Sequence, residues 1–203
     1  MSLRNSVGGV FFYRLLDRVL PWMQRHVTSP NQLTLLGVAI AAAVPFGFYF
    51  SPLAGMILMV LSGLADVADG ALARSSGVQS EYGAFFDSTL DRFSDFFYLM
   101  GFWVLFWPRG EAIPAGVLVG AAFLFTVLIS YTKARAEGLG STCNVGLMER
   151  GFRVLYLIVW ALLLALAPGV RGDLLWIGLV LFCLLTLVTV IQRILHVRAQ
   201  LMK

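Results

Sequence analysis

Four aspartates with short, regular spacings are the part of this sequence best suited to chemistry. They form two pairs, Asp66 with Asp69 and Asp87 with Asp91. Spacings of i,i+3 and i,i+4 place both members of a pair on one face of a helix. The surrounding sequence is apolar, so four negative charges there would repel one another and resist leaving water. A bound divalent cation is the simplest way to hold them together, because hard cations prefer carboxylate oxygens.

The composition predicts that the elements carrying these aspartates cross a membrane. The chain is 59% hydrophobic and only 13% charged, whereas soluble domains are about a quarter charged. Cys143 and Cys183 stand alone, so the sequence indicates neither a disulfide framework nor a zinc site. We expect membrane lipids as neighbours and no nucleic-acid partner.

The helical pattern predicts an all-α protein with six transmembrane helices. A polar loop, 75–82, separates the second and third spans, and a longer cationic link, 133–153, separates the fourth and fifth. Residues 171–173 are predicted to be a short turn before the last span. The spans are predicted at about Leu33–Phe50, from Leu53 through the first aspartate pair, and at Ala84–Trp107, Ala112–Thr132, Val154–Leu166 and Leu174–Ile194.

Residues 1–30 are predicted to form a separate juxtamembrane segment before a transmembrane domain at 31–203. Apolar residues from Phe11 to Met23 recur at helical spacing with Arg14 and Arg18 between them. This pattern is typical of an amphipathic helix on the membrane surface, and an ordinary packed helix is the alternative.

The distribution of lysine and arginine predicts that both termini lie on the cytoplasmic side of the cell membrane. Six spans put both ends of the chain on one side, and positive residues favour the cytoplasmic side. Of the 15 lysines and arginines, only Arg109 and Arg171 fall on the other face. The cytoplasmic set is Arg4, Arg14, Arg18, Arg25, Arg74, Arg92, Lys133, Arg135, Arg150, Arg153, Arg193, Arg198 and Lys203.

This topology brings both aspartate pairs to the same depth. At about 1.5 Å per residue, Asp66 and Asp69 lie roughly 21–26 Å into a hydrocarbon core about 30 Å thick. Asp87 and Asp91 lie in the first turns of the returning helix, and the cationic link 133–153 reaches the same level. Metal-bound carboxylates near arginines suit phosphate chemistry. Asp91, the last of the series, is our candidate general base for a hydroxyl.

The spacing of eight residues resembles the signature of the CDP-alcohol phosphotransferases. The chain reads Asp66-x2-Asp69-Gly70-x2-Ala73-Arg74-x8-Gly83-x3-Asp87-x3-Asp91, with no element missing. The resemblance implies six transmembrane helices, often a homodimer, and attack of an alcohol on a CDP-linked lipid such as CDP-diacylglycerol with release of CMP. It implies Mg²⁺ or Mn²⁺, expected as two ions, held by Asp66, Asp69, Asp87 and Asp91. The nucleotide would contact Asn31, Thr34, Asp66, Asp69, Gly70, Ala73, Arg74 and Gly83.

Two further segments bear on the acceptor alcohol. Residues 131–137 and 146–150 resemble the phosphatidylinositol-phosphate synthase branch of that family, including its archaeal relatives. The chain departs from the branch at 151–153, where Gly-Phe-Arg replaces Pro-Glu-Arg. The resemblance implies inositol phosphate as acceptor, with its phosphate bound by Lys133, Arg135, Arg150, Arg153 and Arg193.

Three alternatives remain open at this point. Glycerol 3-phosphate could be the acceptor, as in a phosphatidylglycerophosphate synthase. An intramembrane prenyltransferase also holds diphosphate and Mg²⁺ with aspartates, but usually has more spans and lacks the Asp-Gly-x2-Ala-Arg run. A transporter needs charged groups near mid-membrane and a path to both faces, whereas these aspartates are expected near one face. Asp95 continues the stripe from Asp91 and is predicted to pair with a nearby arginine in a structural role.

Overall fold

The computed structural model describes residues 29–77 and 80–202, and within these ranges the chain is helical without strands. Six long helices follow one another along the chain, with a single 3-10 turn in each of two connections. They are α2 (Pro30–Phe50), α3 (Pro52–Ser75), α4 (Glu81–Val104), η2 (Trp107–Arg109), α5 (Ala112–Glu137), α6 (Arg150–Leu166), η3 (Pro168–Val170) and α7 (Arg171–Leu201). The all-α prediction is confirmed.

In the part of the chain that the structure describes, four helical segments are long and apolar enough to cross a membrane. They are α2, α3, α5 and the continuous segment Pro168–Leu201 that contains α7. The chain is therefore a multi-pass membrane protein. Helix α6 has only 17 residues and α4 carries several charged side chains, so six spans stay a prediction. The predicted amphipathic helix in 1–30 lies almost entirely outside the described residues.

Serine–proline pairs and serine caps start the helices that form the first half of the fold. Pro30 and Pro52 stand at the first positions of α2 and α3, where the missing backbone N–H costs nothing. Ser51 Oγ accepts the backbone N–H of Ala54, and Ser80 Oγ accepts that of Gly83 at the start of α4. These caps fix where α3 and α4 begin, and hence the faces on which their aspartates lie.

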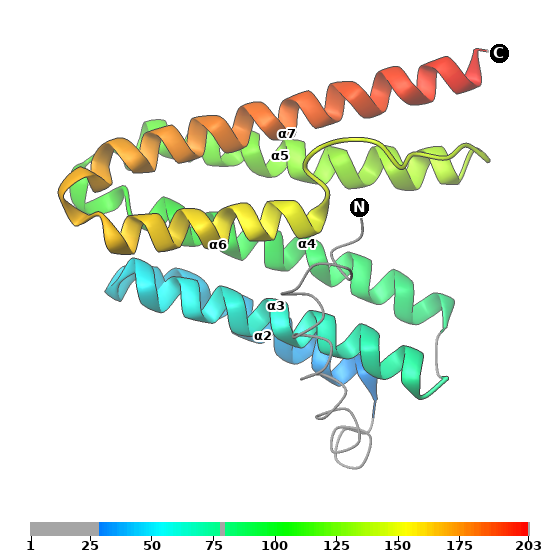
Figure 1. Ribbon diagram of the computed structural model, residues 1–203, viewed down its shortest axis with the longest axis horizontal. Helices are drawn as coiled ribbons and strands as arrows, with labels where there is room; N and C mark the ends of the chain where they lie inside the picture. The colour runs from blue at the N-terminus through cyan, green and yellow to red at the C-terminus, as the bar shows by residue number, and fades with distance from the viewer. Residues whose placement is uncertain (1–28, 78–79, 203) are drawn as a thin grey trace.

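The helices pack as two groups, which meet directly where α4 packs against α5 and are also joined by α6. Helix α2 packs against α3 and α4, α5 packs against α7, and α6 runs between them in contact with α3 and α7 (Figure 1). A buried chain of hydrogen bonds ties the first group together. The Tyr98 hydroxyl donates to Ser62 Oγ at 2.8 Å, and Ser62 donates to the Gly37 carbonyl at 2.7 Å. This chain fixes α3 against α4 about one turn from Asp66.

Several predicted boundaries differ from the structure, including the end of the last helix, which was predicted at Ile194 and lies at Leu201. Helix α5 continues to Glu137, so Lys133 and Arg135 lie on a helix instead of in a link. The nonhelical link is correspondingly shorter, 138–149, and Arg150 and Arg153 belong to the first turn of α6. The predicted turn at 171–173 is wrong, because α7 already begins at Arg171. In each case helical backbone hydrogen bonding continues through polar residues that hydropathy alone assigns to a loop.

Candidate active site

Asp66, Asp69 and Asp87 come together between α3 and α4. Each offers a carboxylate oxygen, and these three oxygens lie within 4.8 Å of one another. Asp69 is buried, and the other two are half-buried. The two aspartates of α3 face the first turns of α4 because the helices run antiparallel around the short connection that includes Gly77 and Ser80. The predicted convergence of the two pairs is therefore present for these three side chains.

Arg150 joins the fourth aspartate to this cluster. Its Nη1 contacts both carboxylate oxygens of Asp66 at 2.8 Å, and its Nη2 contacts Asp91 Oδ1 at 2.7 Å. Asp91 is 8% exposed, and its other oxygen lies 3.4 Å from Arg92 Nη2. Guanidinium forks suit both carboxylate and phosphate. Arg150 thus lies where the phosphate chemistry was predicted, directly against the aspartates.

A polar pocket of about 520 Å³ opens beside the carboxylates. All residues predicted to contact the nucleotide line it except Asp66. A side chain at Gly70 would come within 3.2 Å of the Arg74 guanidinium, and one at Gly83 within 3.1 Å of Ser80 Oγ. Glycine at both positions keeps this pocket open. The full lining is Ser29, Pro30, Asn31, Thr34, Asp69, Gly70, Ala73, Arg74, Ser80, Gly83, Ala84 and Asp87.

Sequence reasoning missed four lining residues: Ser29, Pro30, Ser80 and Ala84. The two serines precede α2 and α4 as N-caps. The sequence does give one signal for these two serines. Each is a helix-start residue close in sequence to a predicted site residue, Asn31 for Ser29 and Gly83 for Ser80. Ala84 directly follows the signature residue Gly83 and carried no signal of its own.

The five predicted acceptor-phosphate residues occupy different environments. Lys133 lies one turn before Glu137 on α5, with its ammonium 3.9 Å from that carboxylate and 43% of the side chain exposed. Arg135 is exposed. Arg193 is 3% exposed and donates to the backbone carbonyls of Val145 and Ile129, the first at 2.9 Å.

Arg153 also bonds inside the protein. It is 2% exposed and donates to Asp95 Oδ2 at 2.9 Å and to the Met148 carbonyl at 3.0 Å. The predicted pairing of Asp95 with an arginine is confirmed. A phosphate-binding role for Arg153 and Arg193 stays a prediction, and their guanidinium groups tie helices together in this structure.

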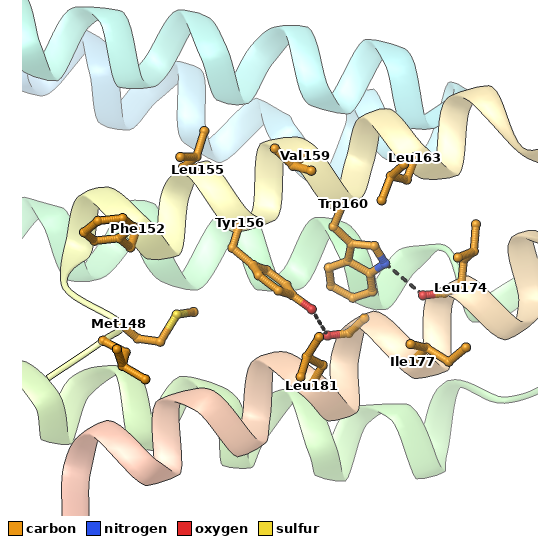
Figure 2. Close-up of a pocket in the computed structure, with 12 residues that line it drawn as sticks. Met148, Phe152, Leu155, Tyr156, Val159, Trp160, Leu163, Leu174, Ile177 and Leu181 are labelled. Atoms are coloured by element: carbon orange, nitrogen blue, oxygen red, sulfur yellow. Dashed lines mark hydrogen bonds between the residues drawn. The ribbon is translucent and has the colours of Figure 1, made fainter. Parts of the chain in front are cut away.

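A second hollow, between α6 and α7, has a different chemical character. This groove of about 410 Å³ is lined almost wholly by apolar residues, with Met148 and Phe152 at one end and Leu163 and Leu174 at the other (Figure 2). Its two polar groups are satisfied across the helix pair, since the Tyr156 hydroxyl and the Trp160 indole N–H donate to α7 carbonyls at 2.8 and 2.9 Å. The groove offers no group for phosphate or metal chemistry.

The carboxylate cluster has the properties of a divalent-metal site. Asp69 Oδ2 and Asp87 Oδ1 are buried oxygens with no hydrogen-bond partner among residues 29–77 and 80–202. Buried polar atoms are normally paired, because desolvation without a partner is costly. Two such oxygens near Asp66 form an all-oxygen set of the kind Mg²⁺ and Mn²⁺ prefer. These residues therefore fit a divalent ion.

The fold and the site together define a multi-pass helical membrane protein with a carboxylate site against a polar pocket. Residues 27–192 match the family model of the CDP-alcohol phosphatidyltransferases, and the chain belongs to this family. Its members are transferases of substituted phosphate groups, so the prenyltransferase and transporter alternatives fall away.

The chain is similar to the archaetidylinositol phosphate synthase of Aeropyrum pernix, with 34% identity over 99% of each chain. It is also similar to solved structures of the phosphatidylinositol phosphate synthase of Mycobacterium tuberculosis. The structure with CDP-DAG bound has 28% identity, a TM-score of 0.73, and coverage of 91% of this chain and 94% of that chain. The structure in complex with manganese and citrate has 27% identity, a TM-score of 0.74, and coverage of 90% and 88%.

Proposed function

We propose that this protein transfers a phosphatidyl or similar lipid-phosphate group from a CDP-lipid to inositol phosphate, with release of CMP. The single observation that carries the proposal is the cluster of Asp66, Asp69 and Asp87, the last two of which line the polar pocket. The relatives named above synthesise inositol-phosphate lipids, which favours this acceptor over glycerol 3-phosphate.

The polar pocket is the proposed nucleotide site. It lies against Asp69 and Asp87, so a cytidine nucleotide seated there would bring its diphosphate to the carboxylate cluster. Gly70 and Gly83 let the backbones of α3 and α4 come close to the ligand. Arg74 is exposed at the pocket rim, where its guanidinium can meet a phosphate oxygen. CDP-diacylglycerol is the proposed donor.

Asp66, Asp69 and Asp87 are the proposed metal ligands, with Asp91 as a ligand or as the general base. These residues would hold Mg²⁺ or Mn²⁺, expected as two ions, and the metal would supply positive charge to stabilise the donor diphosphate. Asp91 accepts the proton of the acceptor hydroxyl, whose oxygen forms a bond to the β-phosphorus while the bond from that phosphorus to CMP breaks. Asp91 Oδ2 is the available oxygen, since among the described residues its one polar contact is Arg92 Nη2 at 3.4 Å. Arg150 orients the other oxygen of Asp91.

Lys133, Arg135 and Arg150 are the proposed contacts of the acceptor phosphate. Arg150 lies against Asp66 and Asp91, and its guanidinium fork suits a phosphate brought to the same place. Lys133 and Arg135 lie in the last turns of α5. The Lys133 side chain is partly exposed and Arg135 is exposed, so both can meet a soluble substrate.

The proposed location of this site is the cytoplasmic face of a cell membrane, with six spans and a homodimeric assembly. The excess of lysine and arginine on the face predicted to carry both termini supports the orientation. Exposed apolar residues along α2, α5 and α7 support contact with lipid or with a second copy.

The experiment that tests this function measures CMP release by the purified protein with Mg²⁺ and CDP-diacylglycerol. Inositol phosphate, glycerol 3-phosphate, inositol and serine are supplied in parallel, and a donor with ether-linked chains is the second arm. We expect turnover with inositol phosphate alone among the acceptors. Turnover with glycerol 3-phosphate instead would change the acceptor, and no CMP release with any alcohol would overturn the proposed function.

A further inference from the structure

Two arginines of α6 meet two aspartates of α4 as successive pairs. Arg150 contacts Asp91 at 2.7 Å, and Arg153, one turn further along α6, contacts Asp95 at 2.9 Å. The first pair belongs to the active site. The second pair is buried, with 2% of the Arg153 residue and 3% of the Asp95 residue exposed.

Arg153 also holds the chain that leads into α6. Its Nη1 donates to the Met148 carbonyl at 3.0 Å, while the Met148 backbone N–H donates to Thr189 Oγ1 of α7 at 3.1 Å. Both backbone polar groups of Met148 are therefore fixed, one by α6 and one by α7. Arg193 of α7 donates to the Val145 carbonyl at 2.9 Å and fixes a second point of the same segment.

The close approach of this segment to α7 leaves space only for glycine at position 146. Gly146 has a φ of +116°, and a Cβ there would lie 2.5 Å from Thr189 Cγ2. The segment 145–149 is thus held against α6 and α7 immediately before Arg150, the first residue of α6.

We infer that Asp95 and Arg153 are positioning residues, which hold the start of α6 so that Arg150 meets Asp66 and Asp91. A misplacement of about 1 Å at a reacting group can cost roughly 100-fold in rate. The inference rests on the proposed function only for its kinetic consequence, because the anchoring itself is a property of the fold.

Arg153→Lys is the variant that tests the anchoring. Lysine keeps the positive charge beside Asp95 but cannot place the two parallel donors of the guanidinium fork. We expect faster amide hydrogen exchange in 145–150 and a kcat lowered about 10- to 100-fold. Arg171→Lys is the matched control, because Arg171 donates to the Leu164 carbonyl at the opposite end of α6. It should change neither measurement.

A double-mutant cycle separates positioning from direct contact with a substrate. If Arg153 acts through Arg150, Arg153→Lys should lower kcat by less than about twofold in an Arg150→Ala background. Equal losses in both backgrounds would overturn the inference and make Arg153 a direct phosphate contact.

A second variant tests the inference if Arg153→Lys fails to fold. Asp95→Leu combined with Arg153→Met removes both charges, which proteins tolerate better than the loss of one partner of a buried pair. We expect it to show the same fall in kcat and the same faster exchange. Wild-type kcat in this double variant would overturn the inference.

The hydrogen-exchange measurement is independent of catalysis. If the wild-type protein releases no CMP with any acceptor, the proposed function fails while the exchange of 145–150 still tests the anchoring. Unchanged exchange in Arg153→Lys would overturn the inference even if the acceptor panel succeeds.

Discussion

Arg150 and Arg92 bring two positive charges to the four negative charges of Asp66, Asp69, Asp87 and Asp91. Two formal negative charges remain after this pairing. That excess lies in an apolar helix bundle, where uncompensated charge is costly. A single divalent ion cancels it, and a second ion suits a site that also receives the diphosphate of the donor. The charge balance of individual side chains thus favours metal-dependent phosphate chemistry.

Asp91→Asn should abolish turnover and leave nucleotide binding intact. The amide keeps the size of the side chain but cannot take the hydroxyl proton, so kcat should fall by about 100-fold or more. CMP release gives the rate, and titration calorimetry with the CDP-lipid gives the binding. Asp173→Asn, in the first turn of α7, is the control and should keep full activity. Near-normal turnover in Asp91→Asn would remove Asp91 as the base.

Lys133→Ala and Arg135→Ala should weaken the acceptor more than the donor. A lost charge-assisted contact to phosphate costs about 1.5–3 kcal/mol, which raises the KM for the acceptor about tenfold or more. Steady-state kinetics with each substrate varied in turn measures both KM values. Arg198→Ala, in the exposed last turn of α7, is the control. A larger rise in the KM for the CDP-lipid would move these two residues to the nucleotide side.

At the scale of the helices, the crossing of α2 with α3 and α4 sets where the aspartates meet. Phe48 of α2 packs against Gly55 of α3 and Gly101 of α4, where an added Cβ would come within 2.4 and 2.5 Å of its ring. Phe48 also contacts the Phe102 ring, with centroids 4.7 Å apart. Small residues let these three helices approach closely enough for one ion to reach side chains of α3 and α4.

Gly55→Ala and Gly101→Ala should therefore destabilise the helix bundle. Overpacking of a filled contact costs about 1–3 kcal/mol, because the added methyl displaces a buried ring. Thermal unfolding in detergent measures the effect as a lowered midpoint. Gly120→Ala on α5 is the matched control, since a Cβ there meets nothing within 4 Å. An unchanged midpoint in both test variants would show that α2 does not need this close approach.

At the scale of the whole molecule, the carboxylate cluster couples metal binding to folding. Asp66 and Asp69 come from α3 and Asp87 from α4, so an ion bound by all three links two helices. A ligand that binds only the folded state raises its stability. The cluster, which costs free energy by repulsion, would then become a stabilising crosslink.

Adding Mg²⁺ or Mn²⁺ should raise the thermal midpoint of the purified protein. At a concentration 100 times the Kd the gain is about 2.7 kcal/mol, and a chelator should reverse it and stop CMP release. Asp69→Asn and Asp87→Asn should reduce the shift, whereas Asp173→Asn should keep it. If neither ion changes the midpoint and a chelator leaves activity unchanged, these aspartates are not metal ligands.

The orientation of the molecule gives a separate test. A reporter that is active only in the cytoplasm should work when it is fused after Lys203. The same reporter inserted after Gly110, in the turn between α4 and α5, should be inactive. The opposite pattern would put the site on the outer face. Equal activity at both positions would contradict the three spans that we predict between Gly110 and Lys203.

The sequence by itself determined the local features of this protein. The spacing of Asp66, Asp69, Asp87 and Asp91 fixed helix faces, and the segments after Ser29 and Ser51 fixed helix starts, because these depend only on backbone geometry within a few residues. The same local reasoning failed at 171–173, where polar residues continue a helix.

Only the tertiary structure decided which cation meets which aspartate. Arg150 contacts Asp66 across 84 positions of sequence, and Arg153 contacts Asp95 across 58. No spacing rule relates residues so far apart, because the partner of a long flexible side chain depends on how the helices cross. The sequence placed Arg150, Arg153 and Arg193 in one class of phosphate-binding residues. Packing gave them different neighbours, since a guanidinium buried between helices must bond to whatever acceptors those helices present.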